Sequence, residues 1–131
     1  MRQPWASLIA SGAKTLEVRS WRTSYRGPLL ICAGARPSGT PDARRWPVTG
    51  PLGCAVACVE LVECRPGVPG EDDEAACCPV AAGGYVWVLT SPREVAPRPI
   101  SGRLGLWALP GLFASALKPA RDPLVPRRTE N

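Results

Sequence analysis

Hydrophobic positions at the start of the chain follow a helical period. Trp5, Leu8 and Ile9 are spaced at i, i+3 and i+4, which predicts one buried stripe of a short helix over about residues 4–11. A proline opens this segment, as is common in the first turn of a helix. Gly12 follows directly and can adopt the positive φ that ends a helix.

The pattern changes to a strand period at residues 15–19. Apolar and polar side chains alternate there, so a strand is predicted with Thr15, Glu17 and Arg19 on its polar face. Lys14 lies at the corner between helix and strand, where its long side chain can swing over that face. We therefore expect a lysine, a carboxylate and an arginine to come together. The alternative is an exposed ion pair beside a solvated lysine, the common outcome for such a string.

The remainder of the chain is typical of short strands separated by turns. A helical turn is expected at about 42–46 and a polar loop at 65–78, whose acidic run Glu71–Glu74 is interpreted as solvated. The further strands are predicted at about 28–33, 52–63, 84–90, 94–100 and 104–109. The prolines of the fourth place it at a sheet edge. Many short strands with one or two short helices predict an α+β fold, a small mixed β-barrel.

Length and composition fit one small domain. The 131 residues suffice for a single core, and 16 prolines with 13 glycines favour short strands over long helices. We place the domain at residues 1–110. Residues 111–131 contain one short apolar patch followed by a Pro/Arg-rich tail, and they are predicted to form a poorly ordered extension.

Positive charge exceeds negative charge along the chain. The net charge of +5 comes from 14 arginines and two lysines against 11 acids. Arginine makes bidentate contacts to phosphates and stacks on rings, so a polyanionic partner is expected, although arginine-rich codon usage would give the same composition. No apolar run reaches the roughly 18 residues that span a bilayer, and the first residues do not open a signal peptide. We expect a cytoplasmic protein without a membrane partner, with a monomer favoured.

The six cysteines do not have the spacing of a metal or disulfide site. Cys54 and Cys58 are four residues apart on a predicted strand, roughly 13 Å, which is too far for a disulfide. Adjacent Cys77 and Cys78 lack the Cys-x-x-Cys spacing of a zinc site, and the chain has no histidine. We therefore expect reduced, buried thiols and no metal or other cofactor.

Candidate chemistry surrounds the first predicted strand. Without histidine, catalysis would fall to Lys14 and Glu17, with Thr15 as a weaker candidate. Glu60 ends another apolar run and is either a second carboxylate of the same cleft or an exit from the core to water. Aromatic and basic side chains that suit stacking on bases and contact with phosphates follow the strand. They are Trp21, Arg22, Tyr25 and Arg26.

Later aromatic residues are interpreted as core. Tyr85, Trp87 and Leu89 share one face of a predicted strand, which suits the wall of a barrel. Of these, Tyr85 or Trp87 could reach a ligand only at the rim.

Several runs resemble a known family. They are Gln3-Pro4-Trp5-Ala6-Ser7-Leu8-Ile9, Gly12-x-Lys14-x-x-Glu17-x-Arg19-Ser20-Trp21-x-Thr23 and Tyr25-Arg26-Gly27-Pro28-Leu29, with later agreement around 52–61, 85–89 and 105–107. Over roughly residues 2–110 the chain is similar to the ASCH domain, a family of PUA-like β-barrels. Relatives usually have a short strand before the first run, for which Met1 leaves almost no room. The expectation is a barrel open at that edge or a truncated start.

The resemblance implies a cleft between the first helix and the barrel that binds RNA or DNA. The residues expected to contact phosphates are Lys14, Arg19, Arg22 and Arg26, and those expected to stack on a base are Trp21 and Tyr25. Held between two cations, Glu17 would accept hydrogen bonds from base amino groups. The sequence leaves open RNA or DNA, and single strands or duplex.

The alternative is a hydrolase on the same cleft. Some members of the family are ribonucleases, and one bacterial branch hydrolyses the modified nucleoside acetylcytidine with a lysine, a threonine and a glutamate. That branch has a threonine where this chain has Glu17, so its nucleophile is absent from its place, although Lys14 matches. Thr15 is shifted by two residues. Whether the protein is an enzyme is therefore left open by its sequence.

Overall fold

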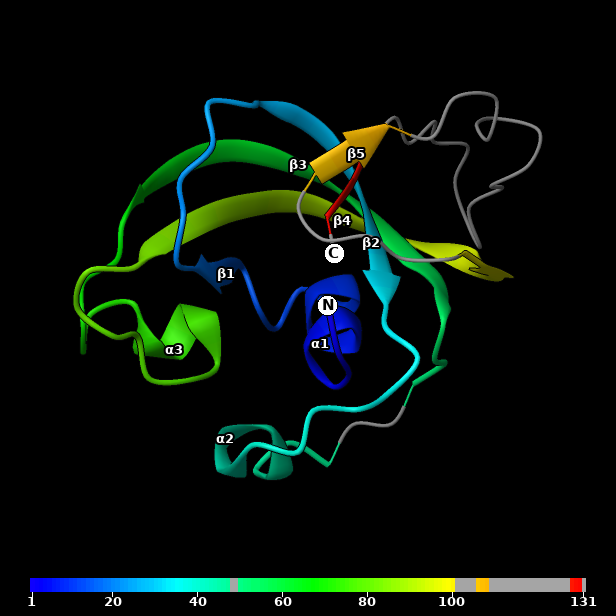
Figure 1. The fold of residues 1–131 in the computed structure, drawn as a ribbon, viewed down its shortest axis with the longest axis horizontal. Coiled ribbons are helices and arrows are strands. Elements are labelled where there is room, and N and C mark those ends of the chain that lie inside the picture. The colour runs from blue at the N-terminus through cyan, green and yellow to red at the C-terminus, as the bar shows by residue number, and fades with distance from the viewer. Residues whose placement is uncertain (48–49, 101–105, 109–127, 131) are drawn as a thin grey trace.

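The structure is a computed structural model that describes residues 1–47, 50–100, 106–108 and 128–130 (Figure 1). Its helices are α1 (Trp5–Ser11), α2 (Pro41–Arg44) and α3 (Asp73–Ala76). Its strands are β1 (Leu16–Arg19), β2 (Gly27–Ala33), β3 (Cys54–Pro66), β4 (Tyr85–Pro99), β5 (Leu106–Ala108) and β6 (Arg128–Glu130). Apart from β6, the predicted extension over 111–131 lies outside the described residues.

One curled sheet makes up the frame, with strand order β1-β4-β3-β2-β6-β5. Neighbouring strands are antiparallel except β2 and β6, which pair in parallel. Figure 1 shows β3 and β4 arching over α1, which lies inside the curve. The predicted α+β fold, a small PUA-like barrel with helices beside it, is confirmed, and the described residues contain three short helices in place of the expected one or two.

Strand β4 joins two segments that were predicted as separate strands. It runs through Ser91, whose φ of 54° bends the chain without ending the strand. Its first part lies between β1 and β3, whereas among the described residues its second part pairs with β3 alone. In this part of the structure the proline-rich second part is therefore an edge, as predicted. Proline is tolerated at an edge because its missing N–H breaks no ladder hydrogen bond.

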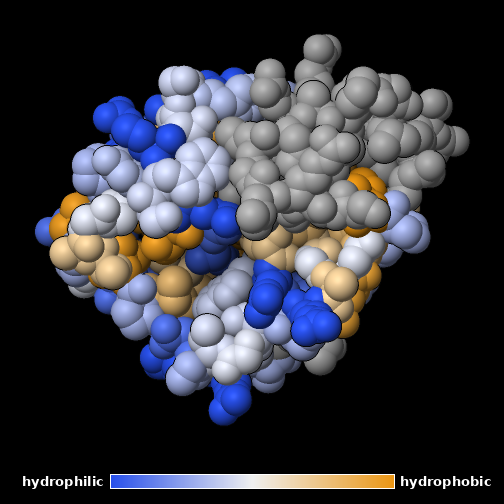
Figure 2. All heavy atoms as spheres, viewed as in Figure 1, coloured by the Kyte–Doolittle hydropathy of each residue, from blue (hydrophilic) through white to orange (hydrophobic). Residues whose placement is uncertain are grey.

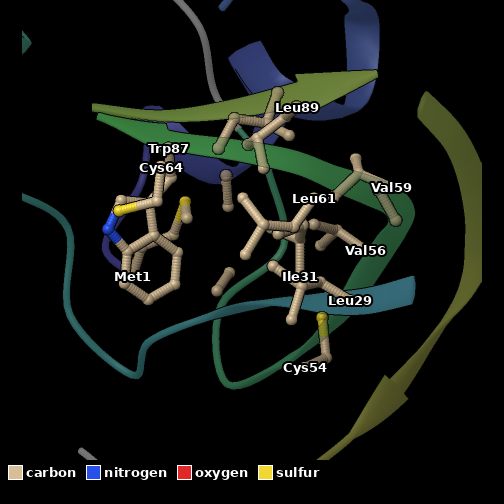
Figure 3. Packing of buried hydrophobic residues seen from close by; sticks show 14 residues of the cluster. Met1, Leu29, Ile31, Cys54, Val56, Val59, Leu61, Cys64, Trp87 and Leu89 are labelled. Carbon is tan, nitrogen blue, oxygen red and sulfur yellow. The ribbon is translucent and has the colours of Figure 1, made fainter. Parts of the chain in front are cut away.

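The main core lies between α1 and the concave face of the sheet. Trp87 is fully buried in this core, and side chains from β2 and β3 belong to the same cluster (Figure 3). Leu89 is also buried, while Tyr85 is half-buried at the margin of the cluster. The predicted core face of this strand is confirmed, but Trp87 lies too deep to reach a ligand.

Gln3 holds the start of α1 in place. Its side chain is 4% exposed, and its Oε1 accepts a hydrogen bond from the backbone N–H of Ser7 at 2.9 Å. Its Nε2 donates to the carbonyl of Pro51 at 3.0 Å. The helix ends at Gly12, which has a φ of 85° as expected for a C-terminal cap. Both ends of α1 are thus fixed, and the chain leaves the helix in a defined direction.

The interpretation of the acidic run as a solvated loop is wrong for Asp72. This residue is 7% exposed, and both its oxygens accept hydrogen bonds from the Arg65 guanidinium at 2.9 Å. The backbone N–H of Val68 donates to it at 2.7 Å. A bidentate arginine offsets the cost of burying the carboxylate, and the run continues into α3.

Asp72 is expected to make the fold sensitive to acid. The Arg65 hydrogen bonds, and then the one from Val68, lower the pKa of Asp72 from 3.8 to about 2. The carboxylate therefore adds stability above pH 4 that is lost as the pH falls towards 2, about 1–2 kcal/mol after solvent screening. Denaturant titrations at pH 6 and pH 2.5 measure this contribution. Asp72→Asn should be less stable than the unchanged protein at pH 6 and should not show this part of the decrease in stability between pH 6 and pH 2.5.

Glu71→Gln is the matched control for that prediction. Glu71 is the exposed neighbour of Asp72, so its change should alter the free energy of unfolding by no more than about 0.5 kcal/mol at either pH. An equal effect of the two substitutions would contradict the role of the Arg65 pair.

Five of the six cysteines are buried and Cys78 is half-buried, with no disulfide among them. Cys32, Cys54, Cys58 and Cys64 pack in hydrophobic clusters, as the sequence predicted, whereas Sγ of Cys77 donates to the carbonyl of Ala13. Burial raises the pKa of Cys58 to about 12, so its thiol is protonated at neutral pH. None of the helices in the described ranges has the length and apolar character needed to cross a bilayer.

Candidate functional site

A cleft of about 550 Å³ opens beside α1 and β1. Figure 2 shows hydrophilic side chains recessed in a hollow of this face, with hydrophobic residues next to them. The cleft is lined by Met1, Arg2, Trp5, Lys14, Glu17, Val18, Arg19, Gly34, Ser38, Thr40, Asp42 and Cys78. Its size falls in the range of small-molecule sites and would admit one nucleoside.

Lys14 swings over the polar face of β1, as the sequence predicted. Its backbone N–H donates to the carbonyl of Leu8 at 3.0 Å, which turns the chain back against the end of α1. Its side chain is 2% exposed, and Nζ donates a short hydrogen bond to the carbonyl of Ala76 in α3. The same Nζ lies 5.1 Å from the centre of the Trp5 ring. The lysine is thus fixed from three sides.

Glu17 lies between two cations. Its Oε1 is 3.8 Å from Lys14 Nζ, and its Oε2 is 3.1 Å from Nη2 of Arg19. The backbone N–H of Val18 also donates to Oε1, at 3.2 Å. The Glu17 side chain is 10% exposed and that of Arg19 21%. The alternative of a solvated lysine beside an exposed ion pair is therefore wrong.

Two other candidates lie outside the cleft. Thr15 was predicted on the same face as Glu17, but its side chain is exposed and does not line the cleft. The reason is its place before β1, where its backbone bonds Ala75 and Leu89. Glu60 lies on β3, opposite residues of β2 and β4, and is half-buried away from the cleft.

The aromatic and basic residues after β1 form a neighbouring surface, which we call the 21–26 loop. Trp21 is 38% exposed and sets its ring edge-on to Trp87, with centroids 4.8 Å apart. The Arg22 guanidinium lies 5.9 Å from the centre of the Tyr85 ring. These side chains do not line the cleft, but Trp21 lies only two residues after Arg19, which does line it.

The rest of this loop is bonded to its own backbone and to the start of β2. The hydroxyl of Tyr25 donates to the carbonyl of Pro28 at 2.7 Å, and its ring packs against the main core. Nη1 of Arg26 donates to the carbonyls of Thr23 and Tyr25, at 3.0 and 2.9 Å. Tyr25 therefore supports the loop from below, while Arg26 is exposed.

Sequence reasoning missed the far wall of the cleft. Arg2, Ser38, Thr40 and Asp42 line it from segments that precede α1 and follow β2. Thr40 accepts a hydrogen bond from the backbone N–H of Ala43 at 3.3 Å and so caps α2. The order Thr-Pro-Asp is a helix-start signature, which indicates α2 but not the position of that helix against the cleft.

No metal site accompanies the cleft in the described part of the chain, where no three cysteine or acidic side chains gather as ligands. The site therefore offers cations, one buried carboxylate, hydroxyls and an indole. Such groups bind, orient and exchange protons.

A short helix inside a curled, mainly antiparallel sheet, with a polar cleft beside that helix, defines a PUA-like α+β protein. The chain belongs to the ASCH domain family, whose model matches residues 1–99. It is 32% identical over 124 residues to activating signal cointegrator 1 of Mus musculus, and 28% identical over 124 residues to the protein of that name in Homo sapiens. Each match covers 83% of this chain and 21% of the relative, so the chain spans about a fifth of their length.

Proposed function

We propose that the protein binds nucleic acid in this cleft, as a binding module of the ASCH family. The observation that carries the proposal is the convergence of Arg2, Lys14 and Arg19 on one open cleft with an indole, Trp5, in its wall. Cations beside aromatic rings contact phosphates and bases together. The net charge of +5 favours the same partner, because it attracts a polyanion from a distance.

A strand would pass from the cleft over Arg19 onto the 21–26 loop. The half-exposed ring of Trp21 offers a stacking surface, and Arg22 and Arg26 are both exposed for phosphates. Lys14 and Glu17 form the floor of the cleft, and their side chains are nearly closed to solvent. This floor would therefore admit a single base and not a paired helix. Single-stranded RNA or DNA is therefore the proposed partner.

The logarithm of the binding constant is expected to fall linearly with the logarithm of the salt concentration, because phosphate contacts release counterions. Arg22→Ala and Arg26→Ala should each weaken binding to all sequences alike and reduce the slope by about one. Anisotropy titrations with labelled single-stranded RNA, single-stranded DNA and duplex DNA measure both quantities.

Arg93→Ala serves as the matched control, because Arg93 is an exposed arginine on β4 that belongs neither to the cleft nor to the 21–26 loop. It should leave the slope within experimental error of the unchanged protein. If no nucleic acid binds at low salt, the proposal is wrong.

A hydrolase on the same cleft is the second candidate function. It is favoured by the burial of the Lys14 and Glu17 pair at 3.8 Å, which joins an oxyanion donor to a general base. The exposed position of Thr15 speaks against the mechanism that the family resemblance implied. Product analysis on the titration samples tests it: turnover that falls at least about a hundredfold in Glu17→Gln, with binding kept, would establish the enzyme.

A further inference from the structure

The floor of the cleft carries a carboxylate, which is the wrong charge for a phosphate. Glu17 lines it beside Lys14, and Asp42 adds a second acid to the far wall. Lys14 and Arg19 already pair with this carboxylate, so a phosphate brought to the floor would compete with Glu17 for the same cations in a nearly dry site, where its repulsion by the carboxylate is strong. The phosphate contacts therefore belong at the rim, and the floor suits a neutral group that donates hydrogen bonds.

The floor has a definite set of donors and acceptors. A carboxylate accepts only, with about two positions on each oxygen. Oε1 accepts one hydrogen bond, from Val18, with Lys14 Nζ farther away at 3.8 Å, and Oε2 has Nη2 of Arg19 at 3.1 Å. On this count of acceptor positions, each oxygen can take one further donor. Nζ of Lys14 has three protons, one of which goes to Ala76. The floor thus combines two acceptor positions with one adjacent cationic donor.

Among the four bases, one presents the complementary edge. The Watson–Crick edge of guanine carries two adjacent donors, N1–H and the N2 amino group, next to the O6 acceptor. Adenine and cytosine each pair one amino group with a ring nitrogen acceptor, and uracil sets one N–H between two carbonyls. Only guanine would meet both oxygens of Glu17 while its carbonyl faces Lys14.

We propose that the cleft selects guanine, with Glu17 accepting from N1–H and N2–H and Lys14 donating to O6. The inference rests on the nucleic-acid binding proposed above and names the base that this site takes. A bidentate base contact is worth about 1–3 kcal/mol of discrimination, which corresponds to roughly a 5- to 150-fold preference.

The test uses oligouridines that carry one central guanine, hypoxanthine, adenine or cytosine, titrated at one fixed salt concentration. Guanine should bind at least about fivefold more tightly than adenine or cytosine. Hypoxanthine, which lacks only the N2 amino group, should fall between them. Equal affinity for guanine and adenine, or a preference for another base, would overturn the proposal.

Two substitutions assign the preference to the floor. Glu17→Gln should remove the preference for guanine. The salt dependence should persist, because Arg22 and Arg26, the proposed phosphate contacts, are unchanged. Glu60→Gln removes a half-buried carboxylate outside the cleft and should keep the preference. A preference for guanine that survives in Glu17→Gln would also overturn the assignment. The comparison among bases needs only the unmodified protein, so it decides the matter even if Glu17→Gln does not fold.

The same titrations separate this inference from the proposed function. Equal, salt-dependent binding of every oligonucleotide would remove guanine selection and leave nucleic-acid binding standing. No binding at low salt to any of them would overturn both.

Discussion

Replacing Trp87 with alanine is expected to lower the free energy of unfolding by about 3–5 kcal/mol. Its ring is fully buried in the cluster between α1 and the sheet, where no neighbour can fill the space that it would leave. Its Nε1 also donates to the carbonyl of Trp21 at 3.3 Å. A domain of this size is stable by about 5–15 kcal/mol, so urea denaturation should show a variant close to unfolding.

Trp21→Ala is the control for that substitution. Trp21 has the same side chain but is 38% exposed and makes an edge contact to Trp87. Its loss should cost about 1 kcal/mol, the scale of one aromatic pair. An equal loss of stability in both variants would contradict the expectation that the buried Trp87 contributes more to the core than the exposed Trp21.

Replacing Lys14 with methionine is expected to cost about 3–5 kcal/mol, because it breaks a buried ion pair from one side. The carbonyl of Ala76 would lose its donor, and Arg19 would remain as the cation paired with Glu17 in the described part of the chain. The volume of the side chain is nearly preserved, so the loss would come from charge and hydrogen bonding. Urea denaturation at low and high salt measures it, and burial predicts little screening.

The double variant Lys14→Met, Glu17→Gln separates this pair from general damage. Removing both charges should cost about 0.5–3 kcal/mol less than the sum of the two single losses. Strictly additive losses would show that the two side chains do not interact. Arg19 is 21% exposed, so in the double variant it can turn to solvent.

Local periodicity predicted most of the fold. The helix at about 4–11 and the first strand were found because their apolar residues repeat at helical and strand spacing. The division of β4 was wrong because Ser91 interrupts the alternation while the hydrogen-bonded ladder to β3 continues. The helix α3 was missed because four residues carry no period. Asp72, which precedes this helix, is buried through its pairing with Arg65 seven residues earlier, and no hydrophobic period signals such a pairing.

The site was predicted where its residues are close in sequence. Lys14, Glu17 and Arg19 lie within six positions, so one corner and one strand bring them together. The opposite wall, with Ser38 and Asp42, comes from another part of the chain, and no local pattern could place it there. Because the 21–26 loop is close to Arg19 in sequence, its residues were also predicted to lie in the cleft. In the structure they do not line it.

The hydrogen bond from Trp87 to the carbonyl of Trp21 has a consequence for the cost of association. Because the donor is a fully buried ring, this hydrogen bond joins the start of the 21–26 loop to the main core. Arg26 and Tyr25 close the far end through backbone carbonyls. The loop is therefore organised before a ligand arrives. A partner would be spared about 0.5–1.5 kcal/mol of ordering entropy for each side chain already held in place.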